Sequence, residues 1–189
     1  DGCLSTYQNK YMVYISGHAV DDLEYHTQIT LQMFQEIFNK KASISFKTGE
    51  NTLFIRFSDK RIFYDIHEHG VPIGRKYDAL KIPEHLSDDM FLDFVRGLFD
   101  TDGCVVLSKQ HRIIPYYPRI EITSKSQKFL ESILLRLRGY GFFGSVSNKG
   151  RGFRLELPGF RNLERWNKLV RPHNPKHLRK ILRILPKSL

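Results

Sequence analysis

The chain has few of the residues that mark a secreted, disulfide-stabilised or membrane-embedded protein. Its 189 residues include only two cysteines, Cys3 and Cys104, which form no Cys-x-x-Cys pair and no Cys/His spacing typical of zinc. It contains no run of 18 apolar residues, and we expect no secretory leader before the fold. We therefore expect two reduced, partly buried thiols in an intracellular protein of the cytoplasm, nucleoid or organelle matrix, neither secreted nor membrane-bound.

Acidic residues are scarce in one half of the chain. The formal charge is +10 overall, but residues 1–87 carry 10 basic and 11 acidic side chains, whereas residues 88–189 carry 20 basic and 9 acidic. A basic half beside a neutral half predicts a polyanionic partner held mainly by the second half. A basic surface that only aids solubility is the alternative.

One helix organises the second half. Ser87 and the two acids after it predict a helix N-terminus, and apolar residues then recur at helical spacing as far as Phe99. We expect this helix over residues 88–101, ending at Asp102-Gly103. A lone Asp-Gly pair is most often only the start of a tight turn.

Two features of this helix favour a functional site. Gly97 lies in its interior, where glycine costs roughly 1 kcal/mol relative to alanine, a cost usually tolerated when a neighbour must approach the backbone. Asp100 and Asp102 lie in the last turn, where the helix dipole already places negative charge, so a cation is expected nearby. A calcium loop is excluded, because the position of its bidentate glutamate is His111.

The chain also repeats itself at an offset near 100 residues. Asp1-Gly2-Cys3 matches Asp102-Gly103-Cys104, and the strand patterns that follow each of them recur in the same order. A period this long indicates a duplicated domain. We expect the first repeat over residues 1–80 and the second over residues 81–189.

Apolar periodicity predicts the same elements in both repeats. In the first repeat we expect strands at 3–8, 10–17, 42–47 and 52–57, helices at 21–38 and 59–68, and a connector at 70–87. In the second we expect strands at 103–109, 118–124, 143–148 and 152–157, helices at 126–139 and 160–169, and a helical tail at 175–185. The predicted fold class is α+β, with two αββαββα repeats that each form a four-stranded antiparallel sheet backed by helices.

The stretch Val95–Gly103 resembles the LAGLIDADG motif of homing endonucleases. The residues identical to the motif are Gly97, Leu98, Asp100, Asp102 and Gly103. Asp1-Gly2 then resembles the last two letters of a first copy, most of whose motif helix the sequence lacks. The resemblance covers the whole chain. It implies a monomer whose two repeats are related by a pseudo-twofold axis and form a DNA-binding saddle, with Gly97 at the contact between motif helices.

The resemblance also implies a metal site. The final acid of each motif binds a divalent cation in this family, which transfers here to Asp1 and Asp102, with Gly2 and Thr101 as further metal contacts. Two carboxylates at negative helix ends repel each other until cations lie between them. Mg²⁺ suits carboxylate and phosphate oxygens, so we expect Mg²⁺ or Mn²⁺ as cofactor and Ca²⁺ as a non-catalytic substitute.

Three lysines match positions of active-site lysines in the family. Lys76 and Lys176 are 100 residues apart, in the connector and in the tail, and a surface role for both is the alternative. Lys125 matches the lysine of a Gln-Lys pair that follows the second strand, although Ser124 replaces the glutamine and Gly17-His18 stands there in the first repeat. This departure predicts an altered water network rather than a lost metal.

Basic side chains are expected on the uncovered sheet faces, where they can contact the major groove. The candidates are Lys10, Lys47, Arg56, Lys109, Arg112, Arg119, Lys149, Arg151 and Arg154. The loop 110–118, which the first repeat lacks, is either a further DNA contact or a plain insertion.

The resemblance thus implies a sequence-specific endonuclease of an intron or intein. It would cut both strands of double-stranded DNA at a long, nearly asymmetric site, leaving short 3′ overhangs. The alternative is a non-cleaving DNA- or RNA-binding protein on the same scaffold, such as an intron-splicing maturase or a regulator. An unrelated RNA-binding module would require the duplicated Asp-Gly-Cys to be accidental.

Overall fold

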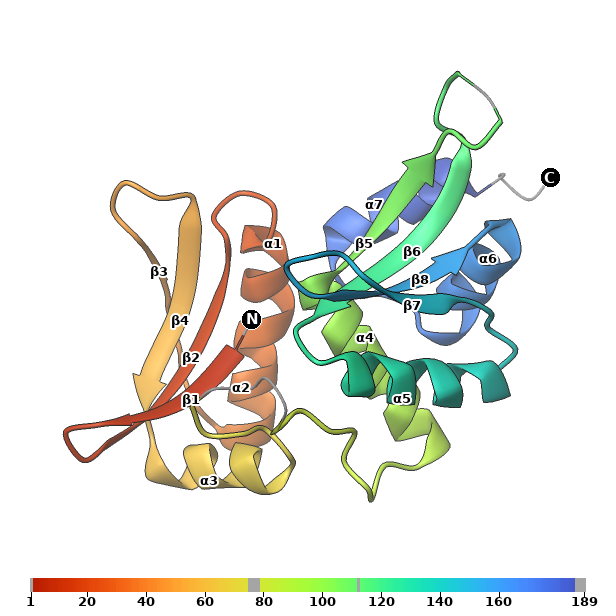
Figure 1. Cartoon of the computed structure of the whole chain (residues 1–189). Helices are drawn as coiled ribbons and strands as arrows, with labels where there is room; N and C mark the ends of the chain where they lie inside the picture. Colours follow the sequence, from red (N-terminus) through yellow and green to blue (C-terminus); the bar gives the residue numbers. More distant parts are fainter. Residues whose placement is uncertain (1, 75–78, 112, 186–189) are drawn as a thin grey trace. The chain divides into compact units, whose positions relative to one another are not determined.

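Two compact units, Asp1–Pro83 and Glu84–Leu189, make up the chain. The computed structural model describes residues 2–74, 79–111 and 113–185. Each unit holds one four-stranded antiparallel sheet with helices packed against one of its faces (Figure 1). The predicted fold class is therefore confirmed. Within the described ranges, no helix is long and apolar enough to span a bilayer.

The first unit has its elements in the predicted order. Its strands are β1 (Gly2–Tyr7), β2 (Lys10–His18), β3 (Ile44–Phe46) and β4 (Thr52–Ser58), and its helices are α1 (Leu23–Tyr25), α2 (Leu31–Phe38) and α3 (Lys60–Glu68). The sheet order is β1-β2-β4-β3. A π-helical segment, His26–Thr30, joins α1 to α2, so the helix predicted over 21–38 forms with one wider turn in its middle.

The first unit closes around an apolar cluster beneath its sheet. The cluster contains Leu4, Val13, Phe34, Ile62 and Phe63, all of them buried. These residues come from β1, β2, α2 and α3, and the partly buried Phe57 of β4 packs against them, so the core holds the first hairpin, β4 and both helical segments together. Burial of such side chains from water is the main favourable contribution to folding.

The second unit repeats this topology. Its strands are β5 (Gly103–Ser108), β6 (Tyr117–Ser124), β7 (Ser145–Asn148) and β8 (Phe153–Pro158), and its helices are α4 (Asp88–Asp102), α5 (Gln127–Gly139), α6 (Phe160–Leu169) and α7 (Pro175–Ile184). The sheet order β5-β6-β8-β7 is equivalent to that of the first unit. The helical tail predicted at 175–185 is α7.

Helix α4 lies in the core of the second unit and is held at its N-terminus. Phe91 and Phe99 are fully buried, and the Phe99 ring packs against the rings of Trp166 (centroids 5.0 Å apart) and His177 (4.6 Å). The Ser87 hydroxyl accepts the Met90 N–H, which confirms the predicted N-cap. The helix is therefore anchored by apolar contacts along its length and by its cap at the start.

Helix α4 passes directly into β5 without a loop residue. Its C-cap, Gly103, is already in extended conformation and is the first residue of β5. A Cβ atom at Gly103 would lie 2.6 Å from the carbonyl oxygen of Phe99 and would also collide with the Phe99 ring. Glycine is required at this position because the backbone folds back onto the last helical turn.

We predict that Gly103→Ala destabilises the protein by about 1–3 kcal/mol, because the new methyl group must displace a buried ring and the helix end. Chemical denaturation of both proteins measures this change. The matched control is Gly97→Ala in the same helix, where the new Cβ would have no described atom within 4 Å apart from its chain neighbours and the nearby helix backbone. The control should be neutral or up to about 1 kcal/mol more stable. Equal effects of the two substitutions would contradict the steric argument.

Candidate functional site

The first acid of the motif, Asp100, is buried and holds two elements together. Its side chain is 1% exposed and accepts the backbone N–H groups of His173 (2.9 Å) and Asn174 (3.0 Å). The Asn174 side-chain amide donates back to the Asp100 carbonyl (2.9 Å). Burial raises the pKa of Asp100, although the two N–H groups favour the charged form. Asp100 therefore fastens the segment between α6 and α7 to the last turn of α4.

The second acid, Asp102, is only half-buried. Its carboxylate accepts the Thr101 hydroxyl (3.2 Å), and that hydroxyl also lies within hydrogen-bond distance of the Gly97 and Leu98 carbonyls. Asp102 is the last residue of α4, so it adds a negative charge to the negative end of the helix dipole. Of the two motif acids, Asp102 is the one that a ligand can reach.

The remaining predicted metal contacts belong to the first unit. Asp1 lies outside the described residues, so its pairing with Asp102 remains a prediction. Gly2 is the first residue of β1. Among the residues that the structure describes, no group of three or more His, Cys, Asp or Glu side chains could hold a metal. The accessible donors, one carboxylate with a neighbouring hydroxyl, fit Mg²⁺, which keeps several waters and commonly shares its site with substrate phosphate oxygens.

Lys125 lies at the same end of the second sheet as Asp102. Gly103 pairs with Ile122 in the antiparallel β5–β6 ladder, so Asp102, the residue before Gly103, lies near the end of β6. Lys125 follows directly after the last residue of β6. The Lys125 ammonium group donates to the carbonyl of Arg151 in the β7–β8 turn. In the first unit the equivalent position is His18, whose Nδ1 lies 3.2 Å from the Asp21 backbone nitrogen.

Lys176 is linked to the end of α4 through Asn174. The Asn174 side-chain oxygen caps α7 by accepting the Lys176 backbone N–H (3.1 Å), while its amide group contacts Asp100. Lys176 therefore lies in the first turn of a helix that is bonded to the last turn of α4, where Asp102 also lies. Lys76 lies outside the described residues, but Gly74 before it donates to the Leu4 carbonyl (2.8 Å), beside β1.

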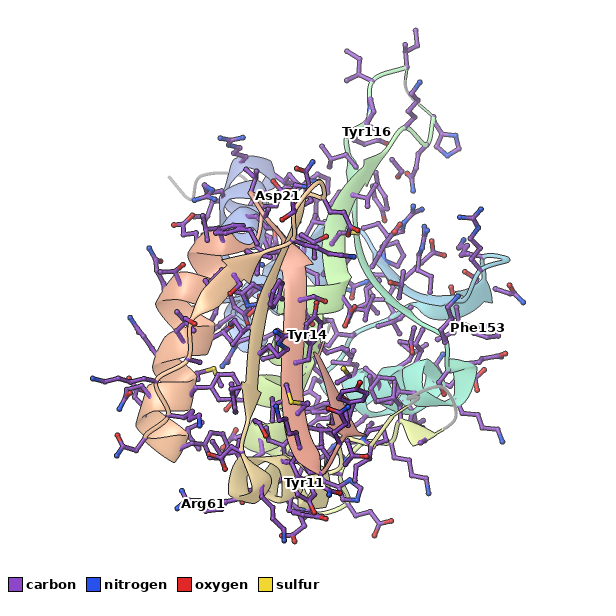
Figure 2. All side chains as sticks on the ribbon, turned by 90° about the vertical axis from the view of Figure 1, so that its left-hand side faces the viewer. Tyr11, Tyr14, Asp21, Arg61, Tyr116 and Phe153 are labelled. Carbon is purple, nitrogen blue, oxygen red and sulfur yellow. The ribbon has the colours of Figure 1, made fainter. Side chains whose placement is uncertain are left out.

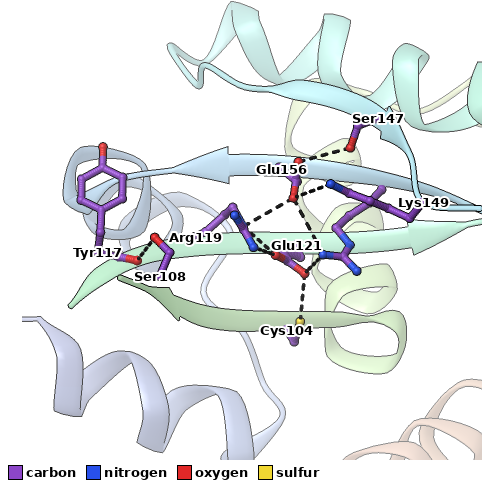
Figure 3. A network of polar contacts seen from close by, with 9 residues as sticks. Cys104, Ser108, Tyr117, Arg119, Glu121, Ser147, Lys149 and Glu156 are labelled. Carbon is purple, nitrogen blue, oxygen red and sulfur yellow. Dashed lines mark hydrogen bonds and ion pairs between the residues drawn. The ribbon is translucent and has the colours of Figure 1, made fainter. Parts of the chain in front are cut away.

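The face of the second sheet that points away from its helices, which we call the outer face, carries a connected set of charges. Glu121 is 4% exposed, and its carboxylate lies between Arg119 (2.5 Å from Nη2 to Oε1) and Arg154 (2.9 Å from Nη1 to Oε2). Glu156 contacts Lys149 (3.4 Å) and lies 3.5 Å from Arg119 (Figure 3). Three predicted DNA-binding residues are thus brought together, each already paired with a carboxylate.

Glu121 and Glu156 were not predicted as part of the site. They lie directly opposite each other on β6 and β8, an arrangement that is destabilising unless cations compensate. The signal was present in the sequence as Arg-x-Glu in both strands. Antiparallel pairing with a period of two places these residues on one face, but their register depends on contacts between distant segments. Cys104 lies beside this set, and burial together with the Glu121 charge raises the pKa of its thiol.

The outer face of the first sheet is aromatic instead. Tyr14 lies on β2 (Figure 2) and stacks with Phe54 on β4, with ring centroids 5.8 Å apart. The Arg56 guanidinium lies 5.6 Å from the Phe54 ring. Lys10, at the start of β2, shares this face by strand alternation. Lys47 lies just beyond β3 and forms an ion pair with Glu50 (2.6 Å), which raises the pKa of Lys47.

The remaining predicted DNA-binding residues lie in the loops of the second sheet. Lys109 is exposed just after β5, and Arg151 is exposed in the β7–β8 turn. Arg112 lies outside the described residues. Near it, Ile113 and Ile114 in the β5–β6 loop are 91% and 74% exposed. The loop thus presents apolar as well as basic side chains.

The fold and the motif define a class. Residues 89–170 match the family model of the LAGLIDADG-like domain, and the chain has the LAGLIDADG endonuclease fold over most of its length. This confirms the resemblance inferred from Val95–Gly103.

Particular proteins share this fold or part of this sequence. A structure of I-DmoI in complex with DNA and Ca is 17% identical with a TM-score of 0.63, over 95% of this chain and 88% of that chain. The N-terminal LAGLIDADG domain of WhiA is 14% identical with a TM-score of 0.56, over 84% and 72%. Elongation factor 2 of Methanopyrus kandleri is 28% identical over 114 residues, which are 59% of this chain but only 8% of that protein.

We predict that Asp100→Asn destabilises the protein by about 1–3 kcal/mol, because the amide group cannot accept both backbone N–H groups. The effect should also depend on pH. The pKa of Asp100 in the folded protein is raised above its ordinary value of 3.8, so between the unfolded and the folded pKa the folded state binds more protons than the unfolded state. The contribution of this carboxyl to the free energy of unfolding therefore falls as the pH rises from about 3.8 through the folded pKa. The difference in free energy of unfolding between wild type and variant should therefore shrink as the pH increases above 3.8. Urea denaturation at a series of pH values from 3.8 upward measures it.

The control for this experiment is Asp93→Asn on the same helix. Asp93 is exposed and pairs with Arg96 (2.7 Å), so its loss should cost less than about 1 kcal/mol. An Asp100→Asn variant as stable as this control would show that Asp100 does not hold the α6–α7 segment.

Proposed function

We propose that the chain is a metal-dependent endonuclease that cleaves double-stranded DNA at a long, nearly asymmetric site. The observation that carries this proposal is the contrast between the two motif acids. Asp100 is buried and holds the fold, whereas Asp102 is only half-buried at the negative end of α4. A carboxylate at that position is unfavourable unless a cation binds it. I-DmoI, which shares the fold, has been crystallised with DNA and Ca or Mn.

Asp102 and Thr101 would hold the metal in the second repeat, and Asp1 and Gly2 would do so in the first. When bound, Mg²⁺ or Mn²⁺ would polarise a phosphate oxygen and lower the pKa of a water molecule, and Ca²⁺ would occupy the site without supporting cleavage. Within the described part of the chain, the Asp102 carboxylate accepts one hydrogen bond, from the Thr101 hydroxyl to Oδ2, which leaves Oδ1 available. These residues bind and orient; they need not themselves transfer protons.

The predicted active-site lysines would place positive charge beside the phosphate that is cut. Lys176 lies in the first turn of α7 and is positioned through Asn174, and Lys125 follows β6 at the end of the sheet where Asp102 lies. Lys76 would take the same role in the first repeat. An ammonium group near a phosphate stabilises the negative charge that develops during hydrolysis.

The sheets would supply DNA contacts, in an intracellular monomer with internal pseudo-twofold symmetry and repeats at residues 1–80 and 81–189. The residues proposed to contact DNA are Lys10, Lys47, Arg56, Lys109, Arg112, Arg119, Lys149, Arg151 and Arg154. A two-stranded ribbon fits the major groove, so two sheets could cover a long site.

A non-cleaving DNA- or RNA-binding protein is the second candidate. Two observations favour it: the fold is shared with the LAGLIDADG domain of WhiA, and Ser124 replaces the glutamine expected before Lys125. In that case Asp102 would be retained without a catalytic role, and the sheets would bind nucleic acid alone.

We predict that Asp102→Asn lowers Mg²⁺-dependent cleavage of a randomised DNA library by about a thousandfold or more, because one ligand of the metal is lost. DNA binding should be retained. Sequencing of the cleaved ends measures cleavage, and a gel-shift assay in Ca²⁺ measures binding. The control, Asp89→Asn in the exposed first turn of the same helix, should cleave like the wild type. Specific binding by all three proteins without cleavage by any would favour the non-cleaving candidate.

A further inference from the structure

The outer face of the second sheet contains a charge arrangement that simple DNA affinity does not require. Its five charged side chains are three cations, Arg119, Lys149 and Arg154, and two carboxylates, Glu121 and Glu156. Acidic groups on a DNA-facing surface weaken the attraction to phosphates. Glu121 is nevertheless almost fully buried between the two arginines, so the carboxylate is built into the sheet rather than left at its margin.

Each oxygen of Glu121 is used by a different arginine. Oε1 accepts from Arg119 through Nε (2.6 Å) and Nη2 (2.5 Å), and Oε2 accepts from Nη1 of Arg154 (2.9 Å). One carboxylate thus fixes the direction of two guanidinium groups, one on its own strand and one on the neighbouring strand. The strand register explains how Glu121 reaches Arg154. Glu121 lies opposite Glu156, and Arg154 lies two residues before Glu156 on the same face of β8, opposite Thr123.

Both guanidinium groups keep donors for a further partner. Glu121 engages the Nε and Nη2 edge of Arg119 and the Nη1 of Arg154, so it leaves Nη1 of Arg119 and Nη2 of Arg154 unused. The Nε of Arg154 is buried without a hydrogen-bond partner among the described residues, so it is not one of these available donors. Both side chains remain 30% exposed. An arginine held in this way presents a planar pair of N–H groups with little loss of side-chain entropy on binding. The geometry that matches such a pair on a base is the O6 and N7 edge of guanine in the major groove.

We propose that Glu121 is a positioning residue that orients Arg119 and Arg154 to read two guanines. It thereby lowers the affinity for DNA of any sequence and raises the specificity for one sequence. This inference rests on the DNA binding proposed above. The carboxylate has two effects. It fixes the guanidinium forks, and it cancels charge that would otherwise attract phosphates at every sequence.

The decisive variant is Glu121→Gln, which keeps the side-chain shape but removes the charge and one of the two acceptor oxygens. The probe is a pool of randomised DNA duplexes, selected by gel shift in Ca²⁺ and sequenced. Wild type should enrich guanine at two positions, and the variant should lose that enrichment by roughly 10- to 100-fold in relative affinity. It should also bind unselected DNA more tightly, with a salt dependence steeper by about one phosphate contact.

Two further variants separate positioning from charge and from stability. Glu164→Gln on α6 makes the same charge change at an exposed site, so it should leave the enriched sequence unchanged. Arg154→Lys keeps the charge but loses the planar fork, so it should lose one guanine while binding to unselected DNA stays the same. Thermal melting of each variant shows whether it is folded; if Glu121→Gln is not, Arg154→Lys carries the test.

The outcomes distinguish this inference from the proposed function. If wild type enriches no sequence, the proposed DNA recognition fails, and this inference fails with it. If wild type enriches a sequence and Glu121→Gln or Arg154→Lys enriches the same guanines equally well, DNA recognition stands and the positioning role is overturned. Lower melting temperature with unchanged sequence preference would mean that Glu121 acts only in the stability of the sheet.

Discussion

The buried carboxylate of Asp100 is the interaction on which the second unit depends most. It lies at the end of α4 and binds two backbone N–H groups from a segment more than 70 residues away in the chain. Without it, that segment would keep only two polar links to α4 among the described residues: the bond from the Asn174 amide to the Asp100 carbonyl and the bond from Arg96 to the Val170 carbonyl. The same contact fixes Asn174, the N-cap of α7, and so fixes the start of the helix that carries Lys176. The fold and the proposed catalytic surface therefore depend on the same carboxylate.

The two acids of the motif illustrate how local environment divides identical chemistry. Asp100 and Asp102 are two residues apart on one helix, so they point in different directions around its axis. One faces the packed segment before α7, where burial raises its pKa, and the other faces outward at the helix end. Only the second is accessible for the metal binding proposed above. A motif match alone assigns both letters the same weight, whereas burial separates the acid that holds the fold from the acid that a ligand can reach.

Much of this architecture was predictable from sequence because its signals are local. Ser87 and the apolar spacing up to Phe99 located α4 to within one residue. The duplicated Asp-Gly-Cys showed that the first hairpin of each unit starts at an equivalent position in the sequence. The ion pairs of Glu121 were missed, because they depend on which residues of β6 and β8 face one another. The π-helical turn at His26–Thr30 was also missed, since no periodicity in the sequence distinguishes it from α-helix. Contacts between distant segments decide such details.

The two sheets differ in chemistry although they share a topology. The outer face of the first carries the stacked pair Tyr14 and Phe54, whereas the second carries ion pairs centred on Glu121. Aromatic rings favour contact with bases or sugars regardless of sign, and paired charges favour directional hydrogen bonds. The two units therefore share a scaffold and differ in surface chemistry, which would suit the proposed recognition of a site whose halves are unlike.

The direct passage from α4 into β5 at Gly103 also constrains how this protein can vary. With no loop to absorb a change in length, one inserted residue between Phe99 and Val105 would rotate the helix by about 100° relative to the strand, or move every side chain of β5 to the opposite face of the sheet. Either event would expose buried residues and withdraw Asp102 from its position. Length changes in this family of folds should therefore accumulate in the hairpin turns and the β5–β6 loop, and not at the junction between helix and strand.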